Sequence, residues 1–221
     1  MALIPPQALL FDLDGTLVDT ERLKWQAYRE TLLRHGVDVG LEEYARRFIA
    51  EGGGPEWACS THGLPISAAE LRAEKAIVYR RLVPVAVRAC PGAEAALARL
   101  APTYALAVVT NSARGETEAI LERLGMTEAF DTLVTREDYA RAKPAPDGYL
   151  EAAERLGHPA EACAVVEDTA RGTAAGVAAG MVVVAVPNAL TADNDFSGAA
   201  VTIAGLDALT PALLRSLGSA R

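Results

Sequence analysis

Short, continuously apolar runs recur along the chain, and longer amphipathic segments lie between them. Continuous apolarity without alternation is typical of parallel strands that are covered on both faces. The runs that we interpret as buried strands are Ala8–Phe11, Ala105–Val109, Thr132–Val134, Ala164–Val166 and Val182–Val186. The amphipathic segments between them have helical length and cover about residues 93–100, 116–124, 147–156 and 171–179. This alternation predicts an α/β fold with a doubly wound, mainly parallel sheet.

The alternation of strands and helices stops between residues 18 and 87. Helical patterns with no strand between them cover about residues 22–35, 41–50 and 68–82. The last of these begins after Ser67, with Glu70 three residues later, which is the signature of a capping box. We interpret the glycine-rich run 52–55 as a loop. The sequence therefore predicts a small α-helical domain at 18–87, inserted into an α/β core made of residues 1–17 and 88–221.

Composition and charge restrict the class of protein. A chain of 221 residues, 51% of them hydrophobic, can bury a sizeable core. Its formal net charge of −8 argues against a nucleic-acid partner, because such binding depends on clustered Lys and Arg. Cys59, Cys90 and Cys163 have neither disulfide nor zinc-site spacing, and the longest apolar segment, 176–187, is too short to cross a bilayer. We expect a soluble, cytoplasmic protein with no membrane partner, and nothing demands more than a monomer.

Polar side chains follow several of the predicted strands. Ligands of doubly wound sheets bind at the carboxyl ends of the strands, so these side chains are the candidates for chemistry. They are Asp12, Asp14, Thr110, Asn111, Lys143, Glu167 and Asp168. Carboxylates gathered at one edge repel one another unless a hard divalent cation holds them, and Mg²⁺ is the simplest choice. With a lysine, a hydroxyl and an amide, such a site suits phosphoryl oxygens, and one carboxylate could be the nucleophile.

Each of these residues alone has an ordinary structural explanation. An Asp-x-Asp pair such as Asp12 and Asp14 more often stabilises a turn. Thr110 alone more often belongs to the start of a helix, and Lys143 alone is more often a solvated charge. Their joint placement after successive strands is what favours a common site.

Four segments resemble, in order, the motifs of a known family. They are FDLDGTLVDTE at 11–21, VVTNS at 108–112, AKPAPDGY at 142–149 and VVEDTARG at 165–172. On these segments the chain resembles the haloacid dehalogenase-like superfamily of phosphohydrolases, in the beta-phosphoglucomutase-like branch with a helical cap between the first two motifs. The resemblance implies that Asp12 is the nucleophile and a metal ligand. It implies that Asp14 is the general acid and base, with its backbone carbonyl on the metal.

The resemblance also assigns roles to the remaining candidates. Thr110, Asn111 and Lys143 would bind the phosphoryl group, while Asp168, with Glu167 beside it directly or through water, would complete the Mg²⁺ site. The implied activity is that of a Mg²⁺-dependent phosphomonoesterase acting through an aspartyl-phosphate on a small phosphorylated metabolite. A loop at 191–198 is similar to one in sugar-phosphate phosphatases of this branch, which favours a sugar phosphate.

Other activities in the family stay open. A dehalogenase has no need of an acid at Asp14, because halide leaves without protonation. A phosphomutase shares all four motifs, but Lys24 stands where such enzymes often carry a histidine, and no clear arginine follows Gly52–Gly54. A phosphonate-cleaving enzyme would need a cap lysine, for which Lys24 and Lys75 are the candidates. A non-catalytic metal-binding protein of the same fold is the remaining alternative.

Overall fold

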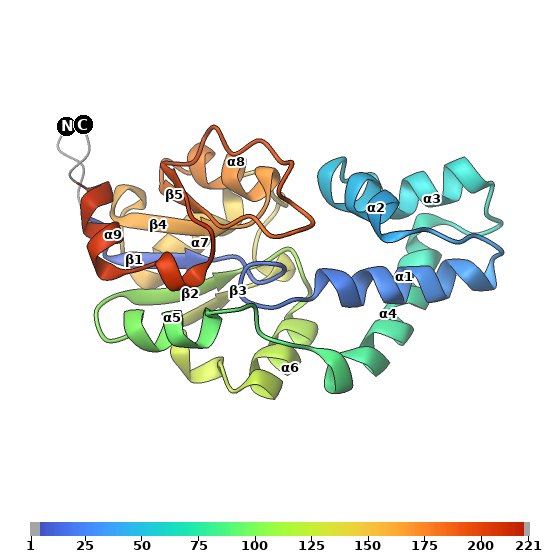
Figure 1. The fold of residues 1–221 in the computed structure, drawn as a ribbon, viewed down its shortest axis with the longest axis horizontal. Coiled ribbons are helices and arrows are strands. Elements are labelled where there is room, and N and C mark those ends of the chain that lie inside the picture. The colour runs from blue at the N-terminus through green and yellow to red at the C-terminus, as the bar shows by residue number, and fades with distance from the viewer. Residues whose placement is uncertain (1–4, 219–221) are drawn as a thin grey trace. The chain divides into compact units, whose positions relative to one another are not determined.

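The computed structural model describes residues 5–218. The chain divides into two compact units, one formed by the residues up to Val18 and from Ala89 onward, the other by Asp19–Arg88. The first unit contains a sheet with helices on it, and the second consists of helices and their connecting loops (Figure 1).

In the described residues, six parallel strands form one sheet in the order β3-β2-β1-β4-β5-β6. The strands are β1 (Ala8–Phe11), β2 (Ala105–Val109), β3 (Thr132–Val134), β4 (Cys163–Glu167), β5 (Val182–Ala185) and β6 (Val201–Thr202). β1 is central, and its Phe11 pairs with Val108 of β2 and Val166 of β4. The chain builds outward from β1 on one side and then continues on the other, which is a doubly wound sheet with its switch point at β1. The predicted fold class is confirmed.

Helices pack on the sheet and account for the continuous apolarity of its central strands. Every residue of β1 is fully buried, because both of its faces are covered. On one face, Ala8 and Leu10 of β1 pack in a core with Tyr149 and Ala175 from two helices. The helices of this unit are α5 (Ala93–Leu100), α6 (Arg114–Leu124), α7 (Asp147–Leu156), α8 (Ala170–Ala178) and α9 (Pro211–Leu217).

The helical unit has an aromatic core of its own. Leu32, Tyr44 and Leu71 are among its buried residues, and Phe48 stacks on Tyr44 with ring centroids 4.8 Å apart. The capping box predicted at Ser67 and Glu70 is present. The helices are α1 (Glu21–Arg34), α2 (Leu41–Tyr44), a π-helical segment (Ala45–Ala50), α3 (Gly54–His62) and α4 (Ala68–Ala86).

The structure differs from the sequence prediction most clearly at α3, β6 and α9. The run 52–55 is not entirely a loop, because α3 begins at Gly54. Pro55 lies in the first turn of α3, where a missing N–H removes no helical hydrogen bond. The sequence analysis did not predict β6, which has two residues, or α9, which has seven. Within residues 5–218, no helix has both the length and the apolar composition required to cross a lipid bilayer.

Candidate active site

The carboxyl ends of the central strands bring most of the predicted residues to one edge of the sheet. The hydrogen-bond ladder continues one residue beyond two of these strands. The amide of Asp12 donates to the carbonyl of Val166 at 3.0 Å, and the amide of Thr110 donates to Val134 at 3.0 Å. The ladder therefore fixes the backbone of both residues, and their side chains begin where the sheet ends.

Lys143 is a buried ammonium group in the loop before α7. Its side chain is 6% exposed, and its Nζ donates to Asp12 Oδ1 at 2.6 Å, to Glu167 Oε1 at 2.7 Å and to the Val109 carbonyl at 2.8 Å. Burial alone would lower the pKa of Lys143, but Asp12 and Glu167 raise it well above its ordinary value. Lys143 is therefore a fixed positive charge between two carboxylates.

Glu167, the last residue of β4, is held by donors on both of its oxygens. Its Oε1 accepts from Lys143 Nζ and, at 2.8 Å, from the hydroxyl of Tyr149. Its Oε2 accepts from the amides of Asp168 and Thr169 at 3.1 and 3.2 Å and from the Thr169 hydroxyl at 2.9 Å. A carboxylate has about four lone-pair directions, so these donors use its capacity to accept hydrogen bonds. The main effect of Glu167 in this structure is to fix Lys143.

The backbone of α8 makes room for this carboxylate. A Cβ atom placed on Gly172 would lie 1.8 Å from both Cδ and Oε1 of Glu167. The first turn of α8 can therefore approach the end of β4 this closely because Gly172 has no side chain.

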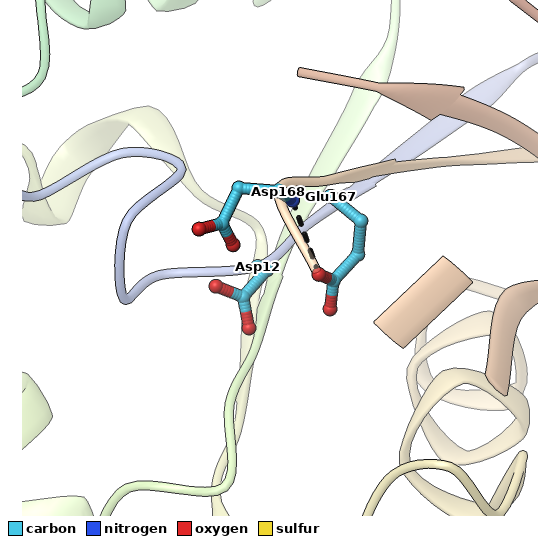
Figure 2. Close-up of side chains that lie close together, drawn as sticks. All are labelled: Asp12, Glu167 and Asp168. Atoms are coloured by element: carbon cyan, nitrogen blue, oxygen red, sulfur yellow. Dashed lines mark hydrogen bonds between the residues drawn. The ribbon is translucent and has the colours of Figure 1, made fainter. Parts of the chain in front are cut away.

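Three buried carboxylates form a cluster that suits a metal ion. Asp12, Glu167 and Asp168 each offer one oxygen, and these oxygens lie within 4.8 Å of one another (Figure 2). Burial raises the pKa of Asp12 to about 8, although Lys143 opposes this effect, and the charges of Glu167 and Asp14 add to it. Carboxylate oxygens are ligands of hard divalent cations, so the donor set fits Mg²⁺, Mn²⁺ or Ca²⁺.

Asp14 and Asn111 are held by neighbours outside that cluster. The Asp14 carboxylate accepts from the hydroxyls of Ser112 at 2.6 Å and Thr110 at 3.1 Å, which ties the loop after β1 to the loop after β2. Asn111 Oδ1 lies 2.7 Å from the hydroxyl of Tyr139 and accepts from the Lys143 amide at 3.3 Å. Asp14 and Thr110 are thus joined to each other, and the other five predicted residues are joined through Lys143 and Glu167.

The sequence analysis missed several residues of this site. Ser112 and Tyr149 lie inside the motif segments but were given no role there. Asn188 lies three residues beyond β5, and its Nδ2 donates to Asp168 Oδ2 at 2.7 Å. The rule that predicted the other residues, that polar groups following a strand face the ligand, would have found Asn188 if applied to the fifth strand.

Comparisons with known proteins find one family and several relatives. A model of the haloacid dehalogenase-like hydrolases matches residues 6–180. Protein CbbY of Rhodobacter capsulatus is 34% identical over 214 residues, which cover 91% of this chain and 94% of that protein. Fructose-1-phosphate phosphatase YqaB of Escherichia coli is 32% identical over 182 residues, covering 78% of this chain and 92% of that protein.

A solved structure has the same fold. It is a mutant of CbbY from Rhodobacter sphaeroides in complex with xylulose-1,5-bisphosphate, with a TM-score of 0.82 and 28% sequence identity. The match covers 95% of this chain and 99% of that one.

The contact between α8 and Glu167 leads to a stability prediction. We expect Gly172→Ala to lower the free energy of unfolding by about 1–3 kcal/mol, because the new methyl group displaces the Glu167 carboxylate from its donors. Urea denaturation measures the change. The matched control is Gly115→Ala near the start of α6, where a Cβ would meet nothing within 4 Å. Equal stability of the two variants would contradict the prediction.

Proposed function

The chain belongs to the haloacid dehalogenase-like hydrolases and is a phosphatase of that superfamily, and on this basis we propose that it is a Mg²⁺-dependent phosphomonoesterase that forms an aspartyl-phosphate on Asp12. The observation that carries the proposal is the environment of the Asp12 carboxylate. It is buried, it is bound to Lys143, and it belongs to the same cluster as Asp168. A nucleophile needs such a fixed position close to compensating charge.

The reaction has two steps. An oxygen of Asp12 attacks phosphorus, the bond from phosphorus to the ester oxygen breaks, and Asp14 donates a proton to that leaving oxygen. Water then attacks the phosphorus of the aspartyl-phosphate, and Asp14 accepts the proton of this water. The bond between phosphorus and Asp12 breaks, which releases inorganic phosphate and restores the carboxylate. The Ser112 hydroxyl, 2.6 Å from Asp14, holds that carboxylate in place for both proton transfers, and the Thr110 hydroxyl, 3.1 Å from Asp14, would turn to the phosphate when it binds.

The charges around Asp12 support the binding of a phosphoryl group. Lys143 offsets the negative charge of nucleophile and phosphate, while Thr110 and Asn111 act as further phosphate-binding residues. The side chains of Asp12 and Asp168 and the backbone carbonyl of Asp14 would hold Mg²⁺. Bound there, the ion supplies positive charge to the phosphoryl oxygens. Glu167, whose oxygens already accept five hydrogen bonds, would lie beside the ion and contribute its negative charge.

The substrate is a small phosphorylated sugar. This part of the proposal is supported by the relatives, one of which is named as a fructose-1-phosphate phosphatase and another of which is solved with xylulose-1,5-bisphosphate. Residues 18–87 would act as the cap that carries substrate specificity and excludes water from the reacting groups.

Replacing the nucleophile tests the central assignment. We expect Asp12→Asn to lower turnover of p-nitrophenyl phosphate by about 10³-fold or more, because the amide cannot form the acyl phosphate. The melting temperature should stay within about 4 °C of the wild type, since Asn keeps the shape and Lys143 keeps Glu167 and Val109 as acceptors. Wild-type activity should disappear in EDTA and return with added Mg²⁺. Metal-dependent turnover by a folded Asp12→Asn protein would remove the nucleophile assignment.

The second step can be interrupted separately. Asp14→Asn lacks the base that activates water, so the enzyme should accumulate phosphate on Asp12 when it reacts with an activated ester that needs little protonation. Intact-protein mass spectrometry after mixing with p-nitrophenyl phosphate should detect one added phosphoryl group. The double variant Asp12→Asn with Asp14→Asn is the control and should remain unmodified. A single variant that turns over without the adduct would contradict the role of Asp14.

Product analysis separates a phosphatase from a phosphomutase, which shares the four motifs. With hexose 1-phosphates and hexose 6-phosphates as substrates, we expect one inorganic phosphate for each sugar phosphate consumed. Phosphate release and sugar phosphate isomers can be followed together by ³¹P NMR. Accumulation of the isomeric sugar phosphate, dependent on a trace of hexose bisphosphate, would instead identify a mutase.

A further inference from the structure

We propose that Asn188 and Thr16 hold the two oxygens of Asp168 from opposite sides, and that this pair, the Asp168 clamp, makes the metal site selective for Mg²⁺ over Ca²⁺. The inference rests on the proposed Mg²⁺ site. Asn188 Nδ2 donates to Asp168 Oδ2 at 2.7 Å, and the Thr16 hydroxyl donates to Asp168 Oδ1 at 3.2 Å. With a donor on each oxygen, rotation of this carboxylate about its Cβ–Cγ bond breaks at least one hydrogen bond.

The orientation of the Asn188 amide is determined by its partners. Its Oδ1 accepts from the Leu190 amide at 2.8 Å, and its Nδ2 donates to the Gly15 carbonyl at 3.2 Å as well as to Asp168. If the side-chain amide were turned over, its oxygen would face two acceptors, the Gly15 carbonyl and Asp168 Oδ2, and its NH₂ group would face a donor, the Leu190 backbone N–H. The two N–H groups of Asn188 are therefore both used on the Asp168 side of the residue.

The loop that carries Asn188 is itself fixed. Thr191 is fully buried, and its hydroxyl accepts from the backbone N–H of Asn188 at 3.0 Å. The backbone N–H of Thr191 donates to the backbone carbonyl of Asn188 at 3.1 Å. Further along, Asn194 Oδ1 accepts from the amide of Ala170 at the start of α8 at 3.0 Å. Asn188 thus has a rigid base from which to hold Asp168.

The other side of the clamp is equally confined. Thr16 is 1% exposed, and Asp168 is fully buried. The backbone of Gly15, with a φ of +92°, passes close to both Asp168 and Asn188. A Cβ atom added to Gly15 would lie 2.3 Å from Asp168 Oδ2 and 3.0 Å from Asn188 Nδ2. Gly15 lets the loop after β1 pass against the carboxylate, and its carbonyl receives the second N–H of Asn188.

A fixed carboxylate discriminates between the two ions. Mg²⁺ demands near-ideal octahedral geometry with short bonds, whereas Ca²⁺ accepts more ligands, longer bonds and carboxylates that bind through both oxygens. A clamp that resists rotation of Asp168 therefore favours the ion that needs one defined ligand direction. Releasing one oxygen should reduce Mg²⁺ affinity and leave Ca²⁺ affinity nearly unchanged. Asn188 and Thr16 are positioning residues in this proposal, because they act through Asp168.

The test compares metal binding by variants of the full chain without substrate. Thermal-shift titrations with Mg²⁺ alone and with Ca²⁺ alone give a dissociation constant for each ion. We expect Asn188→Ala to weaken Mg²⁺ binding by about 10–100-fold, the range typical of residues that orient metal ligands, and to change Ca²⁺ binding much less. Thr16→Val, which removes the opposite donor with little change of shape, should shift the Mg²⁺ to Ca²⁺ ratio in the same direction.

The control is Ser197→Ala in the same loop, because Ser197 is exposed and its backbone amide bonds to Asp195, so this change should leave both dissociation constants unchanged. Parallel weakening of both ions, or unchanged Mg²⁺ affinity, in a folded Asn188→Ala protein would overturn the clamp while leaving the phosphatase proposal intact. A wild-type protein that binds no Mg²⁺ and needs none for phosphate release would overturn both.

Discussion

The site depends on one buried positive charge shared by two carboxylates. Lys143 is almost completely removed from water, a position that is costly for an ammonium group unless strong acceptors surround it. Asp12, Glu167 and the carbonyl of Val109 provide those acceptors and come from the ends of three different strands. Removing one carboxylate would leave the buried charge with a single counter-charge, so the lysine both holds the strand ends together and fixes the proposed nucleophile. Stability and reactivity therefore depend on the same hydrogen bonds.

The central sheet could be predicted from the sequence because its strands are buried on both faces. The ranges Ala8–Phe11 and Ala105–Val109 agree with β1 and β2 residue for residue. Elements at the periphery carry weaker patterns. β6 has two residues, too few for any periodicity. Thr210 followed by Pro211 is a helix-start signal for α9, but the helix is too short for its apolar pattern to stand out.

For the site, the rule that ligands bind at strand ends predicted the edge of the sheet where the acidic residues lie. It did not predict the hydrogen-bond partners of each residue. Asp12 and Asp168 lie in one cluster because adjacent parallel strands end together. The saturation of Glu167 by donors could not be predicted, since it depends on how closely α8 approaches β4 at Gly172. The strand-end rule reaches Asn188, but its hydrogen bond to Asp168 depends on a turn after β5 that no periodic pattern encodes. Side-chain contacts made through irregular loops were therefore the part that the sequence left open.

The central position of β1 has a consequence for the order in which the protein is made. Asp12 precedes its partner Lys143 by 131 residues, and Gly15 precedes its partner Asn188 by 173 residues. Until β4 is synthesised, one edge of an entirely apolar strand has no partner, and such edges promote aggregation. The nascent chain must therefore keep β1 from wrong pairings until β4 has been made, and the carboxylate cluster with its lysine can form only after that.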